Sequence, residues 1–71
     1  MLKKDDLIKW TPERGLLEGV ELLCKVVETM RVFDIFTFQP VDRVIIEFEL
    51  NGKKEQMALP LDAKYEIIEQ N

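Results

Sequence analysis

The chain has 71 residues, a hydrophobic content of 46% and a net charge of -4 at neutral pH. This length suits a single domain, residues 1–71, near the lower limit for a self-sufficient hydrophobic core. The chain has one cysteine, which excludes an internal disulfide. It has no serine and no histidine, which excludes Ser-His-Asp catalysis, Cys-His catalysis and histidine-based zinc sites. No segment approaches the ~20 apolar residues of a membrane helix.

The charge and the first ten residues narrow the setting and the class of partner. Asp5 and Asp6 stand where a signal peptide needs apolar residues, and the single cysteine suits a reducing compartment, so we expect a cytoplasmic protein. Phosphate contacts dominate nucleic-acid affinity, and an acidic chain is at a disadvantage there. We therefore expect neither a nucleic acid nor a membrane as partner. We expect no cofactor, no resident metal ion and no enzymatic activity.

Residues 1–10 form a lead-in whose apolar residues Leu7, Ile8 and Trp10 require cover. We expect a short turn or an edge strand here, with Trp10 covering one end of the core.

Thr11–Met30 is predicted to be one amphipathic helix. Thr11 is a preferred N-cap residue, Pro12 suits the first helical turn, and Glu13 lies where a carboxylate meets the helix dipole. At ~100° per residue the charged side chains gather within an arc of roughly 100° and the apolar ones fill the remainder. The charged arc consists of Arg14, Glu18, Glu21, Lys25 and Glu28.

An all-β alternative exists, an SH3-like small barrel similar in layout to KOW or Tudor modules. In this layout Leu16–Thr29 is a strand, and Leu59-Pro60-Leu61 leads through a short turn to a last strand, Tyr65–Ile68. The period of 3.6 sorts the apolar residues of the first segment better than the period of 2, which favours the helix.

The second half of the chain is predicted to be a three-stranded antiparallel meander. Asn51-Gly52 is the strongest short-range hairpin signal, and a two-residue type I′ loop pairs Leu50 with Lys53, and so on to Val44 with Leu59. Upstream, Val32–Phe38 reads as a strand and Gln39–Asp42 as its turn. That turn sets the pairs Phe38–Arg43, Phe36–Ile45, Ile35–Ile46 and Phe33–Phe48.

This register assigns the two faces of the sheet and hence the predicted architecture. The core face carries Phe33, Ile35, Val44, Ile46, Phe48, Met57 and Leu59, and the helix should pack on it. The predicted fold is thus α+β, one helix on a three-stranded sheet. The tail, Leu61–Asn71, is open: Asp62 could cap a short helix, or Tyr65–Ile68 could form a short edge strand.

Two surfaces are candidate protein interfaces. The outer sheet face would group Phe36, Phe38, Ile45 and Ala58 as an apolar patch rimmed by charge, unless Trp10, Leu7 or the tail covers it. The helix would expose Glu18, Glu21 and Glu28 as an acidic face able to steer toward a basic partner.

Cys24 and the pair Asp34–Glu47 are two further candidate sites. Cys24, on the apolar side of the helix, should be inert core. Asp34 opposite Glu47 is either a hard-cation site or, more simply, a solvated pair.

The sequence therefore predicts a small acidic protein-binding module, such as an inhibitor, an adaptor or an antitoxin-like partner, with possible homodimerisation. The alternative function is a nucleic-acid-binding KOW-like barrel.

Overall fold

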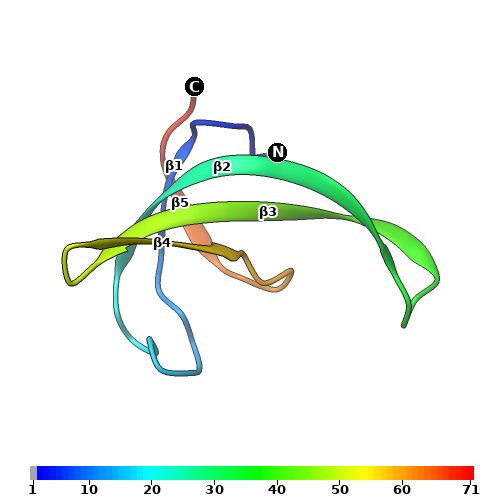
Figure 1. Cartoon of the computed structure of the whole chain (residues 1–71), viewed down its shortest axis with the longest axis horizontal. Coiled ribbons are helices and arrows are strands. Elements are labelled where there is room, and N and C mark those ends of the chain that lie inside the picture. The colour runs from blue at the N-terminus through cyan, green and yellow to red at the C-terminus, as the bar shows by residue number, and fades with distance from the viewer. Residues whose placement is uncertain (1) are drawn as a thin grey trace.

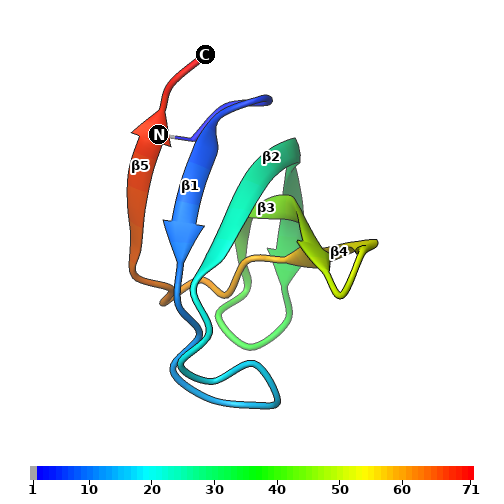
Figure 2. The same cartoon turned by 90° about the vertical axis from the view of Figure 1, so that its left-hand side faces the viewer.

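The computed structural model describes residues 2–71, and within them the chain forms one five-stranded antiparallel sheet without a helix. The sheet order is β4-β3-β2-β1-β5, and Figures 1 and 2 show the sheet strongly curved, with β1 and β5 running across β3 and β4. No helix long and apolar enough to span a bilayer occurs in residues 2–71. The strands are β1 (Leu7–Trp10), β2 (Leu22–Asp34), β3 (Gln39–Leu50), β4 (Lys53–Ala58) and β5 (Tyr65–Glu69).

The predicted helix over Thr11–Met30, and with it the α+β fold, is wrong. Residues 11–21 form a loop in which Gly15 and Gly19 have φ of 91° and 78°, left-handed values that interrupt a helix. Leu22 begins β2, and alternate residues from there to Val26 are buried. The prediction of a helix failed because it assumed that every apolar residue of the segment is buried, whereas several apolar residues of the loop are exposed. Pairing with β1 and β3 then outweighs the local helical pattern.

The structure is all-β and in this respect fits the alternative rather than the α+β prediction. As that layout expects, the segment after Pro60 turns and leads to a final strand, β5. The tail is thus the edge strand of the sheet rather than a helix. The strand expected over Leu16–Thr29 begins later, at Leu22, and runs on to Asp34.

The Asn51-Gly52 hairpin is confirmed in both turn and register. Both residues have positive φ, 53° and 80°, as a type I′ loop requires. The observed pairs run from Leu50–Lys53 to Ile45–Ala58, as predicted. The Leu59 amide donates to the Val44 carbonyl at 2.7 Å, which extends the contact by one further residue.

The turn predicted at Gln39–Asp42 is wrong, because these residues lie inside β3. The chain reverses at residues 35–38 instead. Asp34 Oδ1 accepts a hydrogen bond from the Phe36 amide at 2.8 Å, and the Asp34 carbonyl accepts one from the Phe38 amide at 2.8 Å. A short polar side chain that bonds the backbone two residues on builds such turns. Pro40 is tolerated in β3 because β4 pairs with β3 only from Ile45 onward.

Moving this turn shifts every pair between β2 and β3. Phe33 faces Pro40 rather than Phe48, and Ile46 faces Val26 rather than Ile35. Of the predicted core face, Ile46, Phe48 and Leu59 are buried and Val44 is half-buried, whereas Phe33, Ile35 and Met57 are exposed.

The core lies on the inner face of the curved sheet. Trp10 is buried as predicted, but its strand β1 lies inside the sheet between β2 and β5, not at an edge. Alternate residues of neighbouring strands meet here, as the period of a strand requires. The buried apolar residues are Leu2, Ile8, Trp10, Leu22, Cys24, Val26, Ile46, Phe48 and Leu59.

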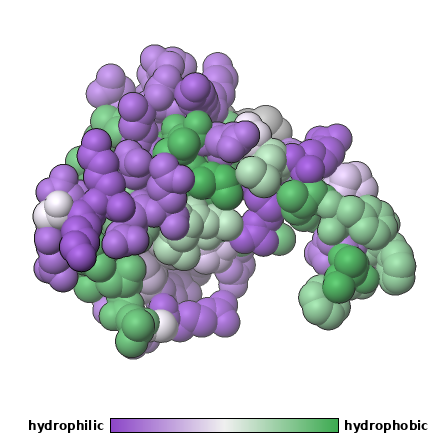
Figure 3. Space-filling view, viewed as in Figure 1, coloured by the Kyte–Doolittle hydropathy of each residue, from purple (hydrophilic) through white to green (hydrophobic). Residues whose placement is uncertain are grey.

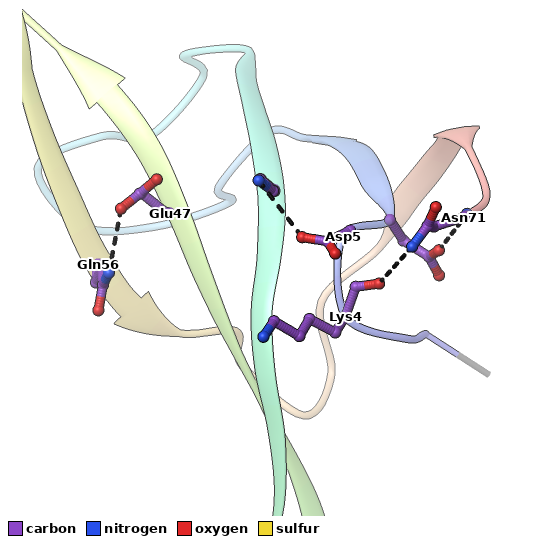
Figure 4. A network of polar contacts seen from close by, with 7 residues as sticks. Lys4, Asp5, Glu47, Gln56 and Asn71 are labelled. Atoms are coloured by element: carbon purple, nitrogen blue, oxygen red, sulfur yellow. Dashed lines mark hydrogen bonds and ion pairs between the residues drawn. The ribbon is translucent and has the colours of Figure 1, made fainter.

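A buried carboxylate joins the two ends of the chain. Asp6 is 1% exposed and accepts 2.8 Å hydrogen bonds from the backbone amides of Lys3 and Asn71. Figure 4 shows the second contact of Asn71, whose side-chain amide donates to the Lys4 carbonyl at 3.5 Å. These bonds hold the C-terminal residue after β5 against the turn before β1.

Candidate protein-docking site

The hairpin of β2 and β3 extends beyond the rest of the sheet. Strand β1 pairs with β2 only at residues 22–25, and β4 pairs with β3 only at residues 45–50. Within the described chain, residues 28–34 and 39–43 therefore pair only along the hairpin itself. Figure 1 shows the outer part of the hairpin projecting as a bent segment, and we call residues 29–44 the arm. A two-stranded ribbon is marginally stable in water unless something packs on it, so the arm is suited to contact another molecule.

The end of the arm is apolar and exposed. Phe36 is 90% exposed and Phe38 is 76% exposed, with Phe33 and Ile35 both above 60%. The rings of Phe33 and Phe38 pack edge to face, with centroids 6.2 Å apart. Figure 3 shows this end of the molecule as a hydrophobic knob separate from the body. We call these four residues the apolar tip. Contiguous exposed patches of this kind mark interaction sites.

The arm is electrically neutral, although the chain is acidic. Residues 30–43 contain two arginines and two aspartates, so the net charge of -4 lies entirely on the rest of the chain. Arg31 Nε donates to Asp42 Oδ1 at 3.0 Å, and this hydrogen bond raises the pKa of the Arg31 guanidinium above its ordinary value. Arg43 Nε is buried without a hydrogen-bond partner among the described residues. An unpaired buried donor is costly, so the isolated arm is incompletely satisfied.

An open groove of about 490 Å³ lies between the base of the arm and the connection from β4 to β5. Thr29 and Val44, a register pair, line it on the arm side, together with the Arg31–Asp42 pair. The opposite wall is mostly apolar and consists of Leu2, Leu59, Pro60, Leu61, Ala63 and Tyr65. We call this space the arm groove.

The predicted apolar patch is divided between two places. Ile45 and Ala58 are register partners in the body of the sheet and are half-buried. Phe36 and Phe38 belong to the apolar tip, and Phe38, the nearer of the two, lies seven residues before Ile45 in the chain. Seven residues of extended strand span roughly 23 Å, so the four side chains do not form one patch. The prediction grouped them because it placed the turn at Gln39–Asp42, which would pair Phe36 with Ile45.

The acidic face predicted for Glu18, Glu21 and Glu28 has no helix to carry it. Glu18 lies in the loop of residues 11–21, Glu21 directly precedes β2, and Glu28 lies in β2 beside a register shift. All three side chains are exposed, but they do not share the face of one element.

The two remaining candidate sites are accounted for by the sheet. Cys24 is fully buried as predicted, and burial raises the pKa of its thiol to about 11, which makes the thiolate scarce at neutral pH. Asp34 pairs with Gln39, while Glu47 accepts a 3.1 Å hydrogen bond from Gln56 Nε2 (Figure 4), so the predicted carboxylate pair does not form. No group of three or more potential metal ligands occurs in the described part of the chain.

Sequence reasoning missed the arm groove and assigned Phe33 and Ile35 to the core. The sequence did contain a usable signal. A turn at residues 35–38 pairs Arg31 with Asp42, two opposite charges, and Val32 with Val41, two β-branched side chains.

Comparison with known proteins adds nothing to this geometry, since no family model, no curated protein and no solved structure matches the chain.

Proposed function

We propose that this protein is a binding module, not an enzyme, and that it docks to another protein through the apolar tip of its arm. The observation that carries the proposal is the exposure of Phe36 and Phe38 at the end of a paired ribbon. Each phenylalanine left in water forgoes roughly 1.5–3 kcal/mol of burial free energy, so covering the tip is strongly favourable. Inhibitors, adaptors and antitoxin-like partners are the classes that act by such docking alone.

The composition of the arm suits a protein partner. Aromatic side chains and arginine are enriched at the centres of protein interfaces, and the arm offers three phenylalanines and two arginines. The acidic body would steer the approach of a basic partner without entering the contact itself. The buried reduced thiol of Cys24 accords with the cytoplasmic setting that we propose.

A nucleic-acid-binding barrel is the second candidate, and the all-β fold favours it more than the predicted α+β fold did. Phenylalanine rings at the tip could stack on unpaired bases. Binding of this kind also requires a positive groove for the phosphates, whereas Asp34 and Asp42 offset Arg31 and Arg43 within the arm. Charge therefore favours the protein partner.

Quantitative affinity capture from the source cell tests the proposed function. The baits are the wild-type protein, the double variant Phe36→Ser/Phe38→Ser, and the control Leu16→Ser, which alters an even more exposed leucine in the loop of residues 11–21. We expect the wild type and the control to retain the same proteins and the double variant to lose them. Identical retention by all three baits would refute docking through the tip.

A further inference from the structure

We propose that the occupant of the arm groove is the apolar tip of a second copy, so that two copies clasp each other reciprocally. This inference rests on the proposed function, because it requires the tip to be a docking element. It adds the partner and the receiving surface. Phe36 and Phe38 of one copy would enter the groove beside Leu61 of the other, and the same contact would repeat in the opposite direction.

The tip cannot enter the groove of its own chain. The arm side of the groove ends at Arg31 and Asp42, and Phe36 lies five residues beyond Arg31. That interval spans roughly 16 Å along an extended ribbon. Folding the tip back would break the pairs Val32–Val41 and Phe33–Pro40. A second copy can supply the same side chains without any change in pairing.

The groove matches the tip in size and in chemistry. A volume of about 490 Å³ lies within the ~300–1,000 Å³ range of sites that hold drug-sized ligands, which leaves room for two aromatic side chains. Leu59, Leu61 and Tyr65 present apolar surface to it. Its charged groups, Arg31 and Asp42, already pair with each other, so an apolar occupant leaves neither charge without its partner.

The charge distribution permits two copies to approach in this arrangement. Bodies that both carry negative charge repel, and a broad contact between them is disfavoured. The arm is neutral over residues 30–43, so a contact between one arm and the other copy's groove brings few like charges together. An anionic membrane or a nucleic acid would face the acidic body of the chain, with no basic patch beside the tip to attract it.

The area available is that of a stable interface. With 150–250 Å² for a whole phenylalanine, the exposed fractions of the four tip residues amount to roughly 500 Å². Two tips and the smaller exposed linings of the two grooves then bury roughly 1,300 Å², at the lower end of the ~1,200–2,000 Å² typical of specific interfaces. Reciprocal exchange also closes on itself, so it yields a two-fold dimer and no filament.

Sedimentation of complementary variants tests the inference. Phe36→Glu places a carboxylate on the tip, and Leu61→Lys places an ammonium group in the groove. Both residues are exposed in a single copy, at 90% and 59%, so the fold does not depend on either. We expect the wild type to be a dimer at tens of micromolar, each variant alone to be a monomer, and an equimolar mixture of the two to recover the dimer. The control Leu16→Glu should sediment like the wild type.

Three results would overturn the clasped dimer: a monomeric wild type at several hundred micromolar, a dimer that persists in Phe36→Glu, or a mixture that stays monomeric. If Phe36→Glu unfolds, as judged by circular dichroism, the double variant Phe36→Ser/Phe38→Ser replaces it in the measurement of each variant alone. A monomeric wild type whose tip variant still loses captured proteins would refute the dimer and leave the proposed function standing. A monomeric wild type with unchanged capture would refute both.

Discussion

Phe33 and Phe38 meet edge to face across the turn that ends the arm, and both rings remain more than half exposed. The contact joins the last pairs of the ribbon to the turn of residues 35–38. It fixes part of the apolar tip in place without burying it. A preformed apolar knob loses less conformational freedom on docking than a flexible loop would, which favours binding.

Phe38 adopts φ of 56°, a left-handed conformation that costs a non-glycine residue roughly 1–2 kcal/mol. Phe38→Gly removes this strain and also removes the Phe33 contact, worth ~0.5–1.5 kcal/mol. We therefore expect the free energy of unfolding to change by less than about 1 kcal/mol in urea titrations, while docking is lost. A loss of several kcal/mol would mean that the ring is a structural element and not a docking one.

Asp6 should make the stability of the fold depend on pH under acidic conditions. The backbone hydrogen bonds from Asn71 and then Lys3 lower the pKa of Asp6 below its ordinary value of 3.8. The unfolded chain therefore binds a proton first as the pH falls, and the stabilisation present above about pH 3.8 is lost as the pH drops through the lower folded value.

The variant Asp6→Ala should consequently unfold at lower urea concentration than the wild type at pH 7, and this difference should shrink as the pH falls below 3.8. The control Asp62→Ala removes a carboxylate whose ion pair with Arg14 is largely exposed, and it should have little effect at either pH. A difference between wild type and Asp6→Ala that is independent of pH would contradict the role given to the carboxylate.

Cys24 should react slowly with thiol reagents in the native protein. It has no exposed surface, and burial raises the pKa of its thiol to about 11. We expect the labelling rate of the native protein to be at least 100-fold below that of the urea-unfolded chain. Equal rates would show that β2 opens readily at this position.

Nucleic acid should bind weakly at physiological salt, despite the all-β fold. The chain carries a net charge of -4, and the arginines of the arm are offset by aspartates. Fluorescence anisotropy with labelled single-stranded and duplex oligonucleotides should give no saturation in the micromolar range. A sub-micromolar dissociation constant that weakens steeply with salt would restore the second candidate function.

The hairpin at Asn51-Gly52 could be predicted from the sequence because the turn chemistry and the pairing agreed. Both residues tolerate positive φ, and the resulting register places Glu49 opposite Lys54. Local and tertiary preferences pointed to one structure there, so tertiary context had nothing to override.

The segment from Thr11 to Met30 could not be predicted in the same way. Its charged residues fall on one side of a helical wheel, yet Leu16 and Leu23 are exposed and β1 pairs with Leu22–Lys25. Hydrophobic patterns assume that apolar residues are buried, and this chain leaves many of them in water. The same assumption placed Phe33 and Ile35 in the core and hid the arm. An element that serves to contact another molecule departs from the pattern of a chain that folds alone.

The most direct test of the account measures folding and docking on one variant, Phe36→Glu. Because the side chain is 90% exposed at the end of the arm, we expect the free energy of unfolding to stay within about 0.5 kcal/mol of wild type, as for other surface substitutions. Self-association and capture of partner proteins should both be lost. A folded variant that associates and captures like the wild type would contradict docking through the tip, and an unfolded variant would contradict the exposed arm itself.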